Sequence, residues 1–142
     1  MLTPLKALFA MTACMSLLGC GTQYKSVPQI EKEILLQSSE SWDGTPYVAY
    51  PKGTPELTLL KLKIPANTSL AWHTHPMPNT AYILSGELKV ESRDNGLVRV
   101  LKPGQTLAEM VNIAHRGVTG NAPVELLVFY AGSPGMPLSE PH

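Results

Sequence analysis

The chain has 142 residues, with 11 Lys or Arg balanced by 11 Asp or Glu, so its formal net charge at pH 7 is zero. A nucleic-acid-binding face needs an excess of positive charge to replace the counterions of the phosphates, so this balance argues against a nucleic-acid partner. Hydrophobic residues make up 44% of the sequence, and the length suits one domain with a core of its own.

The first twenty residues have the organisation of a targeting segment. Lys6 precedes the apolar run ALFAMTACMSLL, which is too short to span a bilayer. The run ends in Leu17-Leu18-Gly19-Cys20, which resembles the bacterial lipobox. The resemblance implies that residues 1–19 are a lipoprotein signal peptide and that Cys20 becomes an acylated N-terminus. An ordinary signal peptide with an incidental cysteine is the alternative.

The lipobox resemblance also predicts a cellular location and a division of the chain into segments. Gly21 follows the cysteine where an inner-membrane retention signal has Asp, so we expect a lipid anchor on the periplasmic face, in the outer membrane of a two-membrane host. With Cys14 cleaved off and Cys20 acylated, we expect no disulfide. Residues 20–30 are then a lipidated tether, residues 31–131 the folded domain, and residues 132–142, rich in Pro and Gly, a flexible tail.

The folded part predicts short antiparallel strands. In residues 57–64, Leu60, Leu62 and Ile64 alternate with lysines, which is typical of a strand with one buried face. Further strands are expected at 34–37, 81–84, 87–91, 97–101, 106–110 and 124–130. Asp94-Asn95-Gly96 predicts a hairpin with a type I′ turn. Since no segment after residue 40 has a helical period, the sequence predicts an all-β antiparallel sandwich or barrel.

Three histidines are candidates for a metal site. On a strand, His73 and His75 project from the same face, so their rings converge. Converging imidazoles suit Zn, Cu, Fe, Ni or Mn. An HxH pair alone is weak evidence, but His115, the other histidine of residues 31–131, follows a turn and strengthens the interpretation. The alternative is that the histidines are structural.

These residues resemble the two motifs of the cupin superfamily. The first motif is Gly, His-x-His, Glu and Gly, and its positions are taken by Asn67, His73, His75, Asn79 and Gly86. The second is Gly, Pro-x-Gly, His and Asn, and its positions are taken by Gly104, Met110, Asn112, His115 and Thr119. The resemblance covers about residues 31–131. It implies an antiparallel cupin-type β-barrel or jelly roll with three histidines and a Glu around one divalent metal.

The departures from the motifs have physical consequences. Asn67 and Asn112 replace turn glycines, and Asn is the residue that best tolerates the left-handed region after Gly. Asn79 instead replaces the carboxylate with a weak amide ligand. The predicted ligands are therefore His73, His75 and His115 with open positions, as in catalytic sites.

Glu109 is an acid within the otherwise apolar segment TLAEMV. Because an unpaired buried carboxylate is costly, one hypothesis is that Glu109 supplies the missing charge. It would do so as a ligand, or by accepting a hydrogen bond from a His ring, and it is the one candidate catalytic residue. The alternative is a rim glutamate paired with Arg116, a residue that also suits an anionic substrate. Tyr130 is expected to pack in the barrel, and Met77 and Met110 to fill gaps rather than bind metal.

Two functions of different classes follow. An open three-histidine site in an apolar barrel favours a metal-dependent oxidoreductase of dioxygenase type acting on a small organic molecule, and zinc would favour Lewis-acid chemistry. Asn79 favours a non-catalytic, lipid-anchored module that binds or senses a small ligand or metal. The resemblance also implies a homodimer in which residues 34–37 join the neighbouring sheet, with a monomer as the alternative.

Overall fold

The fold is built from short β-strands. The computed structural model describes residues 28–142, and residues 33–142 form one compact unit. Residues 28–142 contain no helix, and their strands are β1 (Glu56–Ile64), β2 (His73–Thr74), β3 (Asn79–Ser85), β4 (Leu88–Ser92), β5 (Val98–Leu101), β6 (Thr106–Ala108), β7 (His115–Thr119), β8 (Val124–Gly132) and β9 (Glu140–Pro141). These elements confirm the predicted all-β fold.

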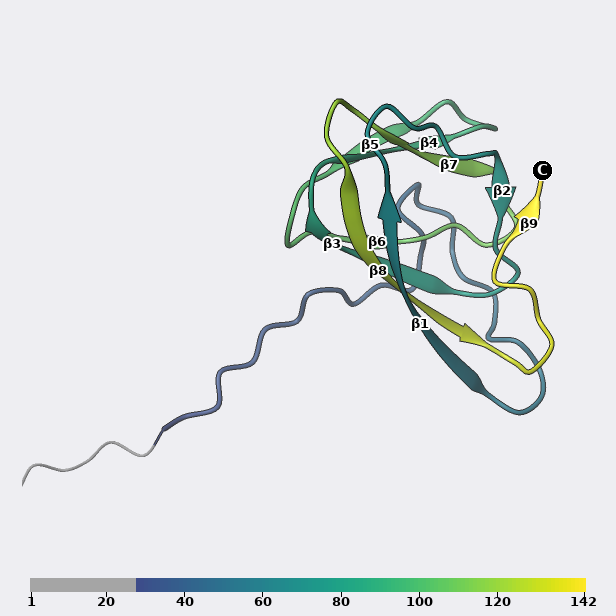
Figure 1. Cartoon of the computed structure of the whole chain (residues 1–142). Coiled ribbons are helices and arrows are strands. Elements are labelled where there is room, and N and C mark those ends of the chain that lie inside the picture. The colour runs from purple at the N-terminus through teal and green to yellow at the C-terminus, as the bar shows by residue number, and fades with distance from the viewer. Residues whose placement is uncertain (1–27) are drawn as a thin grey trace, which may run out of the picture. The chain divides into compact units, whose positions relative to one another are not determined.

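The strands form two antiparallel sheets around one apolar core. One sheet has the order β1-β8-β3-β6 and the other β5-β4-β7-β2-β9, and Figure 1 shows the second sheet in the upper part of the unit. Strand β1 shows why the sheets close on each other: Leu60, Leu62 and Ile64 face inward, while Leu57 and Leu59 stay exposed. The core is filled from both sheets by Ile64, Ile83, Leu88, Val90, Leu101, Leu107, Leu126 and Val128.

The strand predicted at residues 34–37 is wrong. Leu35 accepts a hydrogen bond through its carbonyl oxygen from the Thr106 hydroxyl at 2.9 Å, at the edge formed by β6. This bond comes from a side chain, and no backbone ladder forms beside it. Ile34 is 75% exposed, so its apolar side chain gains little from strand formation.

The predicted hairpin between β4 and β5 is confirmed, but its turn type is wrong. Gly96 has a φ of 67°, whereas Asn95 is not among the residues with positive φ. A type I′ turn needs positive φ at both central residues. The backbone N–H of Ser92 donates to Leu97 at 2.9 Å, which closes a longer loop, and the Asn95 side chain accepts from the Leu97 N–H at 3.0 Å.

The two asparagines at motif glycine positions behave as predicted. Asn67 has a φ of 54° and Asn112 a φ of 56°, and within residues 28–142 they are the non-glycine residues with positive φ. Gly86, which matches the motif, has a φ of 78°, and a Cβ there would lie 2.3 Å from the carbonyl oxygen of Pro123. The motif therefore keeps Gly where both backbone conformation and space require it.

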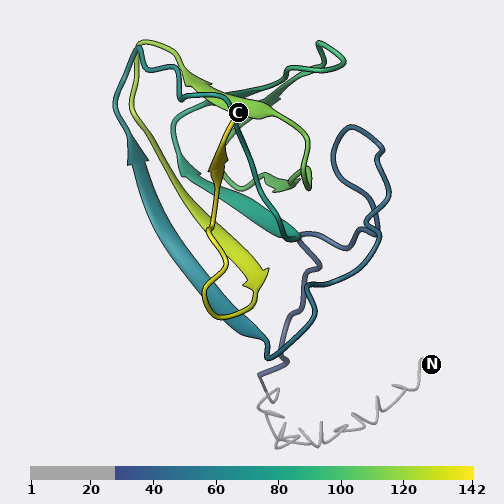
Figure 2. The ribbon, with the colours of Figure 1, turned by 90° about the vertical axis from the view of Figure 1, so that its right-hand side faces the viewer.

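The C-terminal segment packs, so the predicted flexible tail at residues 132–142 is wrong. Ser133-Pro134-Gly135-Met136 is a turn closed by a 3.1 Å bond from the Met136 N–H to the Ser133 carbonyl, with Gly135 at a φ of 82°. The chain then returns as β9 and runs beside β2 (Figure 2). Met136 and Leu138 pack against the core, so Pro and Gly here form a turn rather than a free end.

The predicted signal peptide (1–19) and Cys20 lie outside the described residues. Within residues 28–142, no helix is long and apolar enough to cross a membrane.

Candidate metal centre

The rings of three histidines meet inside the unit. His73 opens β2, His75 follows it, and His115 opens β7 directly across the ladder from His73. The ring centroids are 5.0 Å apart for His73 and His75, 4.7 Å for His73 and His115, and 5.0 Å for His75 and His115. One nitrogen of each ring lies within 4.8 Å of the other two, so the predicted trio is positioned to bind one metal ion.

Each imidazole is held by a backbone carbonyl on its Nδ1 side. The His73 Nδ1 lies 2.9 Å from the Ala71 oxygen, and the His115 Nδ1 lies 2.8 Å from the Ile113 oxygen. The His75 Nδ1 lies 2.6 Å from the Leu138 oxygen. Because a carbonyl only accepts, the proton is assigned to each Nδ1, which leaves Nε2 to bind a metal. This is the arrangement that orients metal-binding histidines in general.

Glu109 faces the histidines. Its Oε2 lies 2.9 Å from the His75 Nε2 and 3.4 Å from the His115 Nε2, and its side chain is 12% exposed. Burial would raise the pKa of Glu109, but the adjoining His115 and His75 imidazoles outweigh it and hold this pKa well below its usual range. Burial lowers the pKa of His75, but its hydrogen bond to Glu109 and the carboxylate charge outweigh burial and raise it.

The alternative interpretation of Glu109, a pair with Arg116, is wrong. Arg116 binds Glu91 instead, with its Nε and Nη2 each 2.8 Å from the Glu91 Oε2. The Arg116 guanidinium also stacks on the Trp72 ring, 4.4 Å from the ring centroid. Arg116 is therefore used on the outer face, and no interaction directs it to the histidines.

Asn79 and Glu109 are neighbours across two strands. Thr80 of β3 pairs with Ala108 of β6, and the Glu109 N–H donates to the Asn79 carbonyl at 3.1 Å. Asn79 is buried, its Nδ2 donates to the Met77 carbonyl at 3.3 Å, and its Oδ1 has no hydrogen-bond partner. A carboxylate, that of Glu109, therefore lies one strand away from Asn79, beside the end of β6.

The donor set fits a cation. With a proton on each Nδ1, the Nε2 lone pairs and the Glu109 carboxylate face one another, and lone pairs repel unless a positive charge lies between them. The hydrogen bond to Glu109 and the carboxylate charge outweigh burial and raise the pKa of His75, which shows that this carboxylate favours a positive charge at the histidines. The buried Nε2 of His115 has no hydrogen-bond partner, and a metal ion would satisfy it.

The cavity at the histidines is small and mostly apolar, with a volume of about 60 Å³. Its lining consists of the three histidines, Glu109, Tyr130, Gly117 and the aliphatic residues Leu62, Ile64, Leu70, Leu88, Val90, Leu126 and Val128. It contains neither Lys nor Arg. The space holds a few water-sized groups. Tyr130, expected only to pack, lines this cavity with its ring centroid 5.5 Å from that of His75. Met77 and Met110, buried in the core, are absent from the lining.

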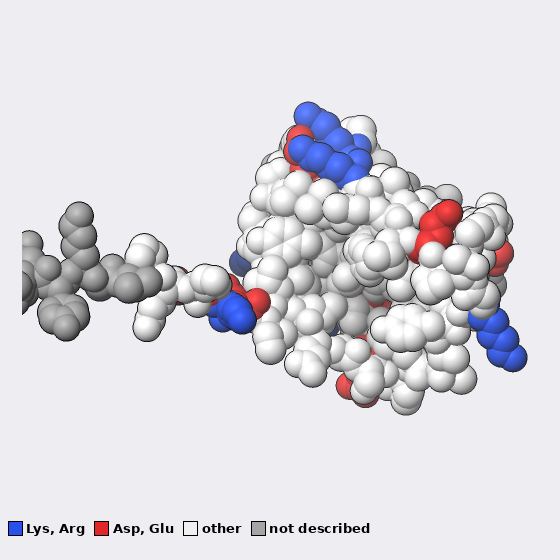
Figure 3. Space-filling model, turned by 90° about the horizontal axis from the view of Figure 1, so that it is seen from below, with Lys and Arg blue, Asp and Glu red and all other residues white. Residues whose placement is uncertain are grey.

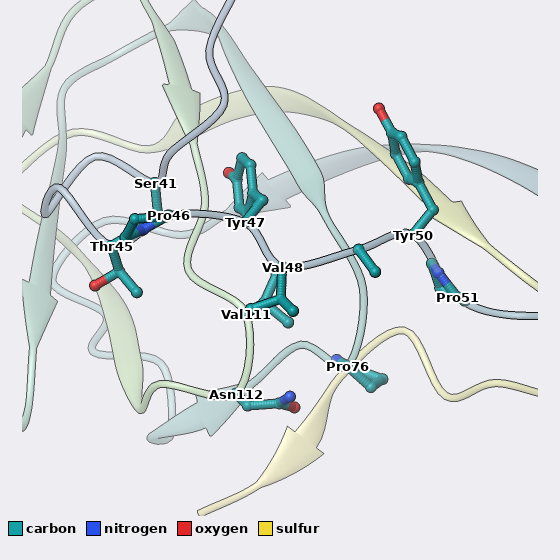
Figure 4. A pocket seen from close by; sticks show the side chains of 11 residues that line it. Ser41, Thr45, Pro46, Tyr47, Val48, Tyr50, Pro51, Pro76, Val111 and Asn112 are labelled. Carbon is teal, nitrogen blue, oxygen red and sulfur yellow. The ribbon is translucent and has the colours of Figure 1, made fainter.

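Tyr47 and Leu138 are site neighbours that sequence reasoning missed. The Tyr47 hydroxyl donates to the Glu109 carbonyl at 2.7 Å, and burial raises the pKa of Tyr47 to about 12. Tyr47 also lines an outer hollow of about 300 Å³, where Pro76 and Asn112 form the opposite wall (Figure 4). Tyr47 lies 62 residues before Glu109 in the chain, and Leu138 acts through its carbonyl, so neither carries a local sequence signal.

The fold is that of a cupin. Residues 60–130, half of the chain, match the family model Cupin_2, described as a cupin domain, so the chain belongs to this family. No match was found among curated protein sequences.

Three solved structures show the same fold at low sequence identity. The DMSP lyase DddQ from Ruegeria pomeroyi DSS-3 is 23% identical with a TM-score of 0.53, covering 66% of this chain and 45% of the lyase. The polyketide cyclase RemF from Streptomyces resistomycificus is 22% identical with a TM-score of 0.53, covering 60% and 59%. An oxalate decarboxylase from Lactobacillus farciminis is 18% identical with a TM-score of 0.50, covering 60% and 26%. The chain thus spans less than half the length of the lyase, and the likeness concerns the fold alone.

Proposed function

We propose that this cupin is a metalloprotein whose single divalent transition metal, one of Fe, Mn, Ni, Cu or Zn, is held by His73, His75 and His115. The observation that carries the proposal is that all three Nδ1 atoms donate to backbone carbonyls, so that one metal-binding nitrogen per ring remains. Three protein nitrogens leave positions free for water or substrate, as in catalytic sites.

Glu109 is proposed to supply the negative charge that the cupin motif places at Asn79. The distance of 2.9 Å between its Oε2 and the His75 Nε2 puts the carboxylate within reach of an ion shared by the histidines. A carboxylate there neutralises part of the metal charge and holds His75. Asn79 does not line the cavity, so it lies beside the metal centre and is not proposed as the main oxygen donor to the metal.

The proposed activity is a metal-dependent oxidoreductase reaction of the dioxygenase type on a small organic molecule. A bound metal supplies a Lewis-acid centre and, where it is redox-active, electrons for oxygen chemistry. The aliphatic walls exclude water, and Glu109 is the residue at the histidines able to take a proton, although its lowered pKa makes it a weak base.

The cavity favours a small substrate without negative charge. Its volume is about 60 Å³, below the several hundred Å³ typical of drug-sized ligands. Its lining offers no Lys or Arg to pair with a carboxylate, which disfavours a dianion such as oxalate. The names of the similar structures point to three different substrates, and none of them is carried over to this chain.

A non-catalytic binding or sensing module is the second candidate. The specific observation in its favour is the same narrow cavity, which suits a metal with one or two small ligands better than a metal, oxygen and organic substrate together.

Elemental analysis followed by oxygen-uptake assays distinguishes the two. The protein without residues 1–19 is purified and its metal content measured, and oxygen uptake is then followed with small neutral phenols and diketones. Bound redox metal with substrate-dependent uptake supports the oxidoreductase, while stable metal or ligand retention without turnover supports the binding module. No metal after reconstitution at neutral pH would refute both.

The proposed location is the cell envelope, with the chain anchored on the periplasmic side of the outer membrane by lipid on Cys20. The support is the sequence Leu17-Leu18-Gly19-Cys20. Mass spectrometry of the full-length protein from membranes is expected to find an acylated Cys20 at the N-terminus. A Cys20→Ser variant that stays equally in the membrane fraction would contradict this.

A homodimer is proposed through the apolar end of the outer face of the β1-β8-β3-β6 sheet, away from the cluster of Lys61, Lys63 and Glu125 on the same face. Seen from below, the unit carries few charged side chains except near its margin and is hollowed near the middle (Figure 3). Leu57, Leu59 and Phe129 are exposed on β1 and β8, and Leu59 pairs with Phe129. Light scattering after size exclusion tests the proposal, and Leu59→Glu is expected to give a monomer.

A further inference from the structure

One of the three histidines is held differently from the other two. His73 and His115 each donate their Nδ1–H to the carbonyl two residues earlier in their own segment. His75 donates to Leu138, which is 63 residues away in the chain, and this is the shortest of the three bonds at 2.6 Å. The orientation of His75 therefore depends on the C-terminal segment, residues 133–142.

The C-terminal segment is fixed on both sides of Leu138. Before it, the turn at 133–136 reverses the chain, and Met136 and Leu138 pack against the core. After it, β9 pairs with β2, with Glu140 opposite Thr74 and Pro141 opposite His73. The His142 N–H then donates to the Trp72 carbonyl at 3.1 Å. Figures 1 and 2 both show this segment alongside β2, the strand that begins with His73.

We propose that the C-terminal segment is a positioning element of the metal centre, in which the Leu138 carbonyl holds the His75 ring with Nε2 turned toward His73 and His115. The proposal rests on the metal-binding part of the proposed function. Leu138 acts through His75 and does not touch the ion. The same segment also pairs with β2, but the ring of His73 is held within its own segment by the Ala71 carbonyl, so His75 is the ligand that the C-terminal segment positions.

Sealing the open edge of β2 is the competing explanation for β9, because an uncovered edge strand invites association with other chains. Edge sealing alone affects stability and aggregation, and it covers both residues of β2, His73 and Thr74, in the same way. Positioning predicts instead a change confined to the ring of His75. A measurement that resolves the three imidazoles one by one therefore separates the two explanations.

Linkage adds a quantitative requirement. If the segment raises the metal affinity by some factor, the bound metal must lower the equilibrium constant for opening of the segment by the same factor. Partners that orient metal-binding histidines are typically worth about 10- to 100-fold in affinity. Hydrogen exchange at the His142 amide should therefore slow by about 10- to 100-fold when Zn²⁺ is bound.

The test compares four proteins: the full chain, a truncation lacking residues 134–142, Leu138→Gly, and Glu140→Ala as the matched control. Leu138→Gly keeps the carbonyl but loses the side chain that anchors it, while Glu140→Ala changes an exposed side chain of the same segment. The readouts are the Zn²⁺ dissociation constant from competition with a chelating dye and the proton exchange of each imidazole Nδ1–H by ¹⁵N NMR.

The truncation is expected to weaken Zn²⁺ binding about 10- to 100-fold, and Leu138→Gly about 3- to 10-fold. In both, the Nδ1–H of His75 should exchange faster, while those of His73 and His115 are unchanged. Glu140→Ala should match the full chain.

A wild-type affinity and a protected His75 proton in Leu138→Gly would overturn the proposal, as would equal loss of protection in all three rings. If the truncated chain does not fold, Leu138→Gly decides alone. If no metal binds, the proposed function fails, but the proton exchange of the metal-free protein still tests the positioning.

Discussion

Exchanging the residues at positions 79 and 109 tests whether the carboxylate has moved across the sheet. In Glu109→Gln the negative charge beside the histidines is lost, while the amide keeps nearly the same shape and can donate to the free Nε2 of His75. Unit charges ~4 Å apart interact by about 4 kcal/mol at an effective dielectric constant of ~20. The amide dipole and the smaller desolvation cost offset part of this, so we expect a net loss of about 3 kcal/mol in metal binding, or about 100-fold in affinity.

Restoring the charge on β3 should recover the affinity. Asn79 and Glu109 lie one step beyond Thr80 and Ala108 in the β3–β6 ladder and are joined by a backbone hydrogen bond, and directly opposed side chains in such a ladder have Cβ atoms about 5 Å apart. The double variant Asn79→Glu/Glu109→Gln is therefore expected to bind Zn²⁺ or Mn²⁺ within about tenfold of the wild type. Asn79→Glu alone places two carboxylates together and should destabilise the metal-free protein by about 1–3 kcal/mol.

Competition titration with a chelating dye measures both effects, and urea unfolding in the presence of EDTA measures stability. Glu125→Gln is the matched control, because Glu125 pairs with Lys61 and Lys63 on the outer face of β8. A dissociation constant for Glu109→Gln within threefold of the wild type would refute the role of Glu109. A double variant that binds no better than Glu109→Gln would show that position 79 does not reach the ion.

The remaining predictions concern pH and backbone conformation. In metal-free protein, the pKa of Glu109 is lowered from 4.5, so the stability that this carboxylate contributes is lost as the pH falls through the lowered pKa. The pKa of His75 is raised from 6.5, so the stability that this imidazole contributes is lost as the pH rises through the raised pKa. Burial lowers the pKa of His73 from 6.5, which opposes the contribution of His75, so the prediction concerns the acid side: urea midpoints should fall as pH drops below about 4.5. An unchanged midpoint below that pH would contradict the buried Glu109 carboxylate. Gly86→Ala is expected to lower the unfolding free energy by at least about 2 kcal/mol. Gly96→Ala, where the added methyl group meets open space, should lower it by about 1 kcal/mol. Equal losses in the two variants would contradict the close approach of the Pro123 carbonyl to Gly86. Asn112→Val should lower the unfolding free energy by about 1–2 kcal/mol, because Val does not tolerate the positive φ of this position. It should also weaken Zn²⁺ binding, because the Asn112 N–H donates to the His75 carbonyl at 2.9 Å. Unchanged Zn²⁺ affinity would show that this bond does not position His75.

Local patterns were enough to predict the all-β fold, the histidine trio and strands β1, β3, β4, β5, β6 and β8, but not β7, β9 or the order of the strands in the sheets. The alternation in β1 reports one buried face, and the spacing of His73, His75 and His115 matches the cupin motifs. Asn67 and Asn112 could be placed in the left-handed region because that preference belongs to the residue itself.

The failures have a common physical cause, which is that composition does not report tertiary partners. The Pro- and Gly-rich sequence after residue 132 suggests a free end, but Pro134-Gly135 suits a turn, and the packing of Leu138 decides between the two. Residues 34–37 have strand propensity, yet they form no ladder and so remain irregular. The Leu138 carbonyl has no side-chain signature at all, so its bond to His75 becomes visible only in three dimensions.

The proposed use of Glu109 at the end of β6, in place of a carboxylate on β3, changes what holds the oxygen donor in place. Strand β3 lies between β8 and β6, whereas β6 spans Thr106–Ala108 at the edge of its sheet, which is a weaker support for a ligand. The Glu109 backbone is held instead by the Asn79 carbonyl and, at 2.7 Å, by the Tyr47 hydroxyl. Tyr47→Phe removes that donor and should cost about 1 kcal/mol in stability, with about a threefold to tenfold loss in Zn²⁺ affinity. Unchanged affinity would mean that the end of β6 is rigid without Tyr47.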